Sequence, residues 1–220
     1  MARCAAAARR ATLRPDEGAP IEITTSSAPS GAGRSVGVDL YWLPLGARGH
    51  FVRLGGKLYE AAAALAGRRT SRPLYHSVLE VTVPDGRFVI EMAPALAAGE
   101  SRGVVAHGSV ATRRAGRFRH LRYEVRCWKD GVTAYAYAVE SPIHVTGDTG
   151  PARLLLELVR TVPAHVWGRD EVGAGEMWTC NSLTSWLLGR TGLWSDAIRP
   201  PGDGRAPGWH AGLVAAERSA

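Results

Sequence analysis

The chain has 220 residues, of which 45% are hydrophobic and 21% are charged, and these fractions suit a globular protein with one well-formed core. Its formal net charge is +7, but nearly all of the positive charge is arginine, a bias that GC-rich codon usage also produces, so the charge alone predicts no function. No apolar run is long enough for a membrane span. Three cysteines without a CxxC pair argue against a disulfide framework or a zinc site. We therefore expect a cytoplasmic protein without metal or cofactor.

The first 34 residues are rich in alanine, serine, proline and glycine, and we expect residues 1–34 to form a flexible tail. Arg9 and Arg10 interrupt the alanine run, so the sequence does not predict a secretory signal there. Residues 35–220 are expected to form a single globular domain, and its proline- and glycine-rich end, residues 199–220, is expected to be mostly irregular.

Strands are predicted at residues 35–46 and 50–54, and the helix formers of residues 57–67 predict a helix that ends at a glycine. The clearest strand signal lies at residues 74–94. Two runs of β-branched and apolar residues there flank Asp85-Gly86, which is a typical hairpin turn.

Two further strands are predicted at residues 102–110 and 118–128, followed by an extended segment at residues 133–142. A helix is predicted from near Pro151 to just before Pro163. Strands in the middle of the chain with helices at the flanks predict an α+β fold, in which helices flank an antiparallel sheet.

A short helix is predicted to begin at Cys180, capped by Thr179 or Asn181. Its core-facing residues follow Cys180 at helical intervals: Leu183, Trp186 and Leu187. Because a helix N-terminus favours negative charge, we expect the pKa of the thiol to be lowered and the thiolate, which is the reactive form, to be enriched. A small buried hydrophobic residue is the alternative interpretation of Cys180.

A cysteine nucleophile needs a base within hydrogen-bond reach, and His76 is the candidate among the seven histidines. It begins the clearest predicted strand, and on that strand it shares a face with Val78 and Glu80. A strand end is a rigid platform for a base, but a histidine that is hydrogen-bonded at a sheet margin fits the same position. Both interpretations stay open.

Two separate blocks of the sequence resemble one group of enzymes. The block LYHSVLEV…DGRFVIEMAP is similar to the strand–turn–strand block of the lecithin retinol acyltransferase-like proteins, in which a histidine precedes a strand, an Asp-Gly turn and a strand of the type V-I-H-L-A-P. The block WTCNSLTSWLLGRTG resembles that group's cysteine helix. The order of the blocks is that of the circularly permuted NlpC-type branch of the papain-like superfamily, and the PPPDE-type thiol peptidases share it.

Carried over to this chain, the resemblance implies a permuted papain-like fold, with Cys180 as the nucleophile and His76 as its general base. The group's third position, a histidine, falls on Glu91, whose carboxylate would orient the imidazole. A two-residue turn at Asp85-Gly86 would pair Glu91 with Glu80 and place it about 13 Å along the strand from His76.

The first functional hypothesis is a thiol hydrolase or acyltransferase that forms a thioester at Cys180. Its substrate would be a peptide, amide or acyl compound, and an amide or peptide bond is favoured because no membrane anchor is visible. Trp178 would line the acyl pocket, and Asn181 would hydrogen-bond the substrate. The second hypothesis is a catalytically inactive papain-like binding module. Thr179, where the group has asparagine, favours it, as would a Cys180 sulfur that is buried or far from His76.

The third hypothesis is a basic protein that associates with nucleic acid. Six arginines crowd into one segment of the chain: Arg113, Arg114, Arg117, Arg119, Arg122 and Arg126. Tyr123 and Trp128 in the same segment would stack on bases. Alternation along the predicted strand places Tyr123 on the core side and leaves one aromatic residue beside the arginines, so a solvated sheet face is the alternative interpretation.

Overall fold

The architecture comes from a computed structural model, which describes residues 35–45, 68, 70–95, 103–131 and 135–219. Three predictions fall elsewhere in the chain and lie outside these described residues. They are the tail at residues 1–34, the strand at residues 50–54 and the helix at residues 57–67.

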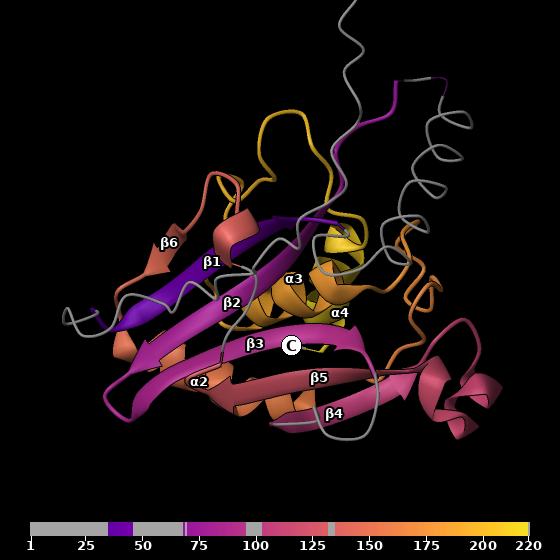
Figure 1. The fold of residues 1–220 in the computed structure, drawn as a ribbon, viewed down its shortest axis with the longest axis horizontal. Coiled ribbons are helices and arrows are strands. Elements are labelled where there is room, and N and C mark those ends of the chain that lie inside the picture. The colour runs from indigo at the N-terminus through magenta and orange to yellow at the C-terminus, as the bar shows by residue number, and fades with distance from the viewer. Residues whose placement is uncertain (1–34, 46–67, 69, 96–102, 132–134, 220) are drawn as a thin grey trace, which may run out of the picture. The chain divides into compact units, whose positions relative to one another are not determined.

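Six strands form one antiparallel sheet in the order β4-β5-β3-β2-β1-β6 (Figure 1). The strands are β1 (Gly37–Pro44), β2 (Tyr75–Val83), β3 (Gly86–Pro94), β4 (Val104–Ser109), β5 (Arg122–Lys129) and β6 (Ile143–Thr146). The strands predicted at residues 35–46, 74–94 and 102–110 are confirmed. β5 begins four residues later than predicted, and β6 was not predicted.

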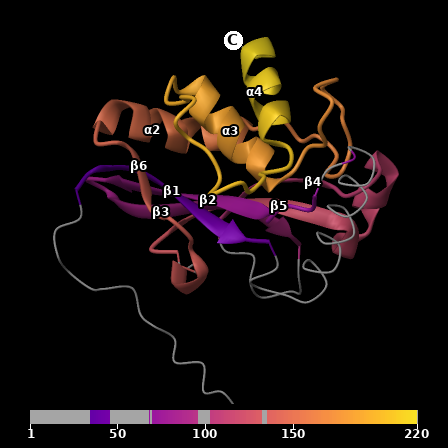
Figure 2. The same cartoon turned by 90° about the horizontal axis from the view of Figure 1, so that it is seen from above.

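Three helices cover one face of this sheet (Figure 2). They are α2 (Thr149–Leu158), α3 (Cys180–Arg190) and α4 (Trp209–Arg218). Four short 3-10 turns complete the described elements: η1 (Arg113–Arg117), η2 (Arg119–Leu121), η3 (Tyr135–Tyr137) and η4 (Val159–Thr161). The predicted α+β class with an antiparallel sheet is therefore confirmed. Within the described ranges, no helix has the length and apolar character that a membrane span requires.

Two predictions about the second half of the chain are wrong. The segment predicted as extended at residues 133–142 contains the 3-10 turn η3. The end of the chain, predicted to be irregular, contains α4, because the prolines stop at Pro207 and the ten residues that follow Gly208 form a helix. Its buried face consists of small residues, Ala211, Gly212, Ala215 and Ala216, which give only a weak apolar pattern in the sequence.

The turn between β2 and β3 lies one residue earlier than the sequence predicts. Val83 pairs with Gly86, so the two turn residues are Pro84 and Asp85. The predicted pairing of Glu80 with Glu91 is wrong, because Glu80 pairs with Val89. Proline has a fixed φ near −65° that suits the first turn position. Gly86 then takes the first position of β3 with a φ of +133°, which favours glycine. The corrected register moves every residue of β3 two places relative to β2.

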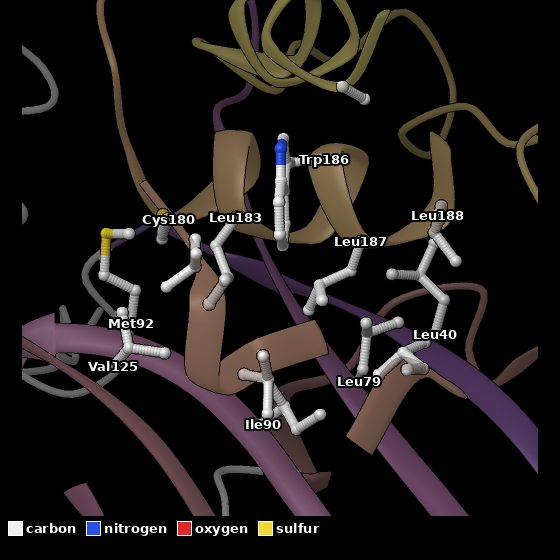
Figure 3. Packing of buried hydrophobic residues seen from close by; sticks show 14 of the residues in the cluster. Leu40, Leu79, Ile90, Met92, Val125, Cys180, Leu183, Trp186, Leu187 and Leu188 are labelled. Carbon is white, nitrogen blue, oxygen red and sulfur yellow. The ribbon is translucent and has the colours of Figure 1, made fainter. Parts of the chain in front are cut away.

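The main core lies between the helices and the sheet (Figure 3). Strand residues and α3 residues contribute to it together, among them Leu40, Leu79, Ile90, Leu183 and Leu187, all with 1% exposure or less. A second, smaller cluster lies on the opposite face of the sheet and consists of Leu43, Val78 and Val89. The central strand β2 is therefore buried on both of its faces.

Candidate site at the start of helix α3

Helix α3 begins with a capping box. The Thr179 hydroxyl accepts a hydrogen bond from the Asn181 backbone N–H at 3.1 Å, and the Ser182 hydroxyl accepts one from the Thr179 N–H at 2.9 Å. The same two hydroxyls donate to the carbonyls of Pro207 and Gly208, at 2.6 Å and 2.7 Å. Of the two predicted caps, Thr179 is the one that forms, and the cap also fixes α3 to the loop that precedes α4.

Asn181 joins α3 to β2 through its side-chain amide. Its Oδ1 accepts from the backbone N–H of Ser77 at 2.9 Å, and its Nδ2 donates to the carbonyl oxygens of Tyr75 at 3.0 Å and Pro207 at 3.1 Å. The Ser77 hydroxyl lies 2.9 Å from both Asn181 Oδ1 and Thr184 Oγ1. Asn181 is the only asparagine in the chain, which has no glutamine, and its side chain is buried.

The amide of Asn181 replaces strand pairing. β2 and β3 are paired from Val83↔Gly86 to Leu79↔Ile90, and beyond this point the two strands diverge (Figure 1). The N–H of Ser77 and the carbonyl of Tyr75, which follow along β2, are bonded to Asn181 instead. A buried backbone group without a hydrogen-bond partner destabilises the fold. The Asn181 amide therefore supplies the partners that these two backbone groups lose where the strands diverge.

The Cys180 thiol lies in the core between α3 and the sheet. The residue is 5% exposed, and Figure 3 shows it beside Leu183 and Met92. Burial raises the pKa of the thiol to about 12, outweighing the hydrogen bonds from the Asn181 backbone and the Thr179 side chain that lower it. The lowered pKa expected from the helix N-terminus is therefore not what the structure gives, because loss of water around the thiolate dominates.

His76 lies on the other face of the sheet. β2 pairs regularly with β1 from Thr82 to Tyr75, so its side chains alternate between the two faces. Ser77 faces α3, to which it is hydrogen-bonded, whereas half-buried His76 shares the opposite face with Val78 of the smaller cluster. The structure thus places the predicted nucleophile and the predicted base on opposite sides of β2.

Glu91 shares the face of His76, and its offset from His76 along the strand is smaller than the sequence predicts. Continuing the observed register by one residue places Glu91 level with Val78, two residues from His76 and about 7 Å along the strand. Its buried carboxylate lies 3.9 Å from the guanidinium of Arg126, which also binds Glu124 at 2.9 Å. The charge of Glu91 adds to the rise in the pKa of Cys180, so these two predicted site residues do interact electrostatically.

A second charged cluster on this face was not predicted. Arg87 donates to Glu80 at 2.9 Å, to the hydroxyl of Tyr135 at 3.1 Å and to the carbonyl of Gly131 at 2.7 Å, while Tyr135 donates to Glu80. Burial lowers the pKa of Arg87, but Glu80 and Tyr135 together outweigh the effect of burial, so the pKa is raised overall. Burial, followed by Glu80, raises the pKa of the Tyr135 hydroxyl. These hydrogen bonds hold η3 and the residues just after β5 against the β2–β3 hairpin.

The two residues predicted to bind substrate are both packed inside the protein. Trp178 is 1% exposed, and its ring meets His165 edge-on with centroids 4.7 Å apart. The Asn181 amide is used in full by Ser77, Tyr75 and Pro207. Neither side chain presents a free surface to a substrate.

The residues at the start of α3 are arranged to hold the helix against the sheet and not to activate the Cys180 thiol. His76, the predicted base, faces away from Cys180, the thiol is neutral at physiological pH, and the polar groups at the helix start are bonded to backbone.

Within the described ranges, no group of three or more histidine, cysteine, aspartate or glutamate residues is placed to hold a metal ion. No known protein family, curated protein or solved structure matches the chain.

Proposed function

We propose that this chain is a non-catalytic binding module with a permuted papain-like arrangement. The burial of Cys180, whose side chain is in the core and whose thiol pKa is raised to about 12, is the observation that carries the proposal. A nucleophilic cysteine needs a thiolate and access to substrate. Cys180 has neither, and His76 on the far face of β2 does not supply a base.

Two features support the papain-like part of the proposal. The helix that begins at Cys180 packs on an antiparallel sheet, and it packs against β2 and β3, the hairpin that carries the histidine and the third position of the resemblance. The helix also follows that hairpin in the chain, which is the permuted order. The position of His76 on the outer face departs from the resemblance, and this departure supports a scaffold that does not perform catalysis.

A thiol hydrolase or acyltransferase remains the second candidate function, and one observation favours it. The hydrogen bonds of Asn181 hold the start of α3 to the backbone of β2 on both sides of His76. The negative charge of Glu91 also contributes to the raised pKa of the Cys180 thiol. The start of α3 therefore lies over the segment of β2 that carries His76, although Cys180 and His76 lie on opposite faces of that strand. Catalysis would require His76 to turn to the face of α3 and the thiol to become accessible.

Alkylation kinetics separate the two candidates. We expect Cys180 of the native protein to react with iodoacetamide at least about a hundredfold more slowly near pH 8 than in the urea-unfolded chain, because the folded thiol is both buried and protonated. The rate is read by mass spectrometry of the peptide that contains Cys180, against pH, in the wild type and in His76→Ala. The two profiles should coincide.

Cys127 serves as the internal comparison, because it is a second free cysteine that is only half-buried. Burial raises the pKa of its thiol to about 11, and the charge of Arg160 partly offsets this rise. Rapid alkylation of Cys180 at neutral pH that is lost in His76→Ala would contradict the binding-module proposal and favour the hydrolase.

A further inference from the structure

The most concentrated positive charge of the described chain lies between β4 and β5. Residues 111–122 contain five arginines and one histidine and no acidic residue. The sequence predicts a strand over part of this segment, but the segment forms η1 and η2, which we call together the basic turns (residues 113–121). The side chains of Arg113, Arg114, Arg117, Arg119 and His120 are exposed there.

Two of these arginines are available to a ligand. Among the described residues, Arg114 and Arg117 form no ion pair. Arg113 differs, because its guanidinium binds Glu171 at 3.0 Å. Arg169 adds a further exposed guanidinium beside the basic turns, since its Nε donates to the carbonyl of Ala111 at 2.9 Å. The positive charge on this surface exceeds what its acidic neighbours neutralise.

An exposed aromatic ring lies in the middle of this charge. Phe118 is 45% exposed, and the Arg117 guanidinium carbon lies 4.6 Å from the centre of its ring. The His120 ring stacks on Phe118 with centroids 5.8 Å apart and planes 29° apart. Tyr123, an aromatic residue that the third hypothesis placed against bases, is instead buried in the core at 1% exposure. The exposed stack is therefore Phe118 with His120.

The basic turns are also held in a fixed conformation. The Thr112 hydroxyl caps η1 by accepting from the Ala115 N–H at 3.2 Å, and the Phe118 N–H donates to the Ala115 carbonyl at 2.9 Å. The strands on either side, β4 and β5, are paired with each other. A prearranged surface loses little conformational entropy on binding.

These observations favour one class of partner. Arginines beside a single exposed ring match the requirements of single-stranded nucleic acid, in which phosphates meet the guanidinium groups and an unpaired base stacks on the ring. A membrane surface fits less well, because insertion needs several apolar side chains together. The exposed large hydrophobic residues of the described chain lie on separate elements: Val104, Phe118, Tyr137 and Leu154.

We propose that the basic turns bind single-stranded nucleic acid, with Arg114 and Arg117 on phosphates and the Phe118–His120 stack against a base. This inference uses a surface distant from Cys180 in the sequence and does not depend on whether that thiol reacts. The sequence of the nucleic acid is not read by these contacts, because phosphates and stacking are common to all bases.

Fluorescence anisotropy with a short labelled oligothymidylate tests the proposal. The double variant Arg114→Glu/Arg117→Glu should weaken binding at least about tenfold and reduce the slope of log affinity against log salt by about 1.4, for two phosphate contacts. Phe118→Ala should weaken binding about tenfold with the salt slope unchanged. The matched control is Arg153→Glu/Arg199→Glu, which changes the net charge equally at exposed arginines outside the basic turns, and it should weaken binding less than threefold.

Four results would overturn the proposal. Equal weakening in both double variants would show a dependence on net charge alone. If a duplex of the same oligonucleotide with its complement bound as tightly as the single strand, the proposed stacking of an unpaired base would be contradicted. The same conclusion would follow if Phe118→Ala had no effect on binding. Binding to phosphatidylserine vesicles without binding to the oligonucleotide would replace nucleic acid with a membrane surface. Unfolding midpoints of all variants, measured in parallel, identify any change that arises from loss of folding.

Discussion

Replacing Arg87 with methionine is expected to lower the free energy of unfolding by about 3 kcal/mol. The substitution keeps most of the side-chain volume but removes the guanidinium from the Glu80 carboxylate, which is 3% exposed, and from the hydroxyl of Tyr135 and the carbonyl of Gly131. Removing one partner of a buried ion pair leaves the other charge in a medium that solvates it poorly. Urea unfolding followed by circular dichroism measures the loss.

Arg153→Met is the matched control for this prediction. Arg153 binds Asp85 at 2.8 Å, but both side chains are at least half exposed. Water already solvates and screens this pair, so the same substitution should cost no more than about 0.5 kcal/mol. Equal losses for the two variants would contradict the structural role assigned to the Arg87 cluster.

Asn181→Ala is expected to lower the free energy of unfolding by about 3 kcal/mol. Alanine cannot bond the N–H of Ser77 or the carbonyl of Tyr75, and both groups would be left buried without a partner at the point where β2 and β3 diverge. The carbonyl of Pro207 would keep its hydrogen bond from the Thr179 hydroxyl. Each buried backbone group without a partner costs roughly 1–3 kcal/mol, and partial rearrangement of α3 keeps the sum below the upper limit. Urea unfolding measures this loss as well.

The control for Asn181 is Asp148→Ala, which removes a helix cap that water can replace. Asp148 accepts from the N–H of Gly150 at 2.8 Å at the exposed start of α2, so its loss should cost about 1 kcal/mol. If Asn181→Ala cost no more than this, the amide would be an ordinary cap rather than a substitute for strand pairing.

The sequence predicted the α+β class, the antiparallel sheet, the start of α3 and the residues that share a face of β2, because these depend on local spacing. It did not predict which face the helices cover. Alternation is informative only when one face of a strand is polar, and β2 carries Val78 on one face and Leu79 on the other, both fully buried. The position of His76 relative to α3 therefore depends on packing between elements that are far apart in the chain.

The sequence also could not give the sign of the change in the pKa of Cys180. A helix N-terminus stabilises a thiolate by about 0.3–1 kcal/mol, less than one pKa unit. Complete burial moves a pKa in the opposite direction by as much as 3–5 units. The residue at the helix start is visible in the sequence, but its burial depends on how α3 packs against the sheet, where Cys180 lies beside Met92.

The claim that Cys180 is a buried packing residue is tested most directly by its ionisation. In protein carrying ¹³C-labelled cysteine, the Cβ chemical shift of Cys180 should stay constant as the pH rises through about 8.5, the usual thiol pKa, because the folded thiol has a pKa of about 12. In the unfolded chain the same signal should titrate near that usual value. A transition of the folded protein below neutral pH that moves upward in His76→Ala would contradict the account, because it would show a thiolate held by that imidazole.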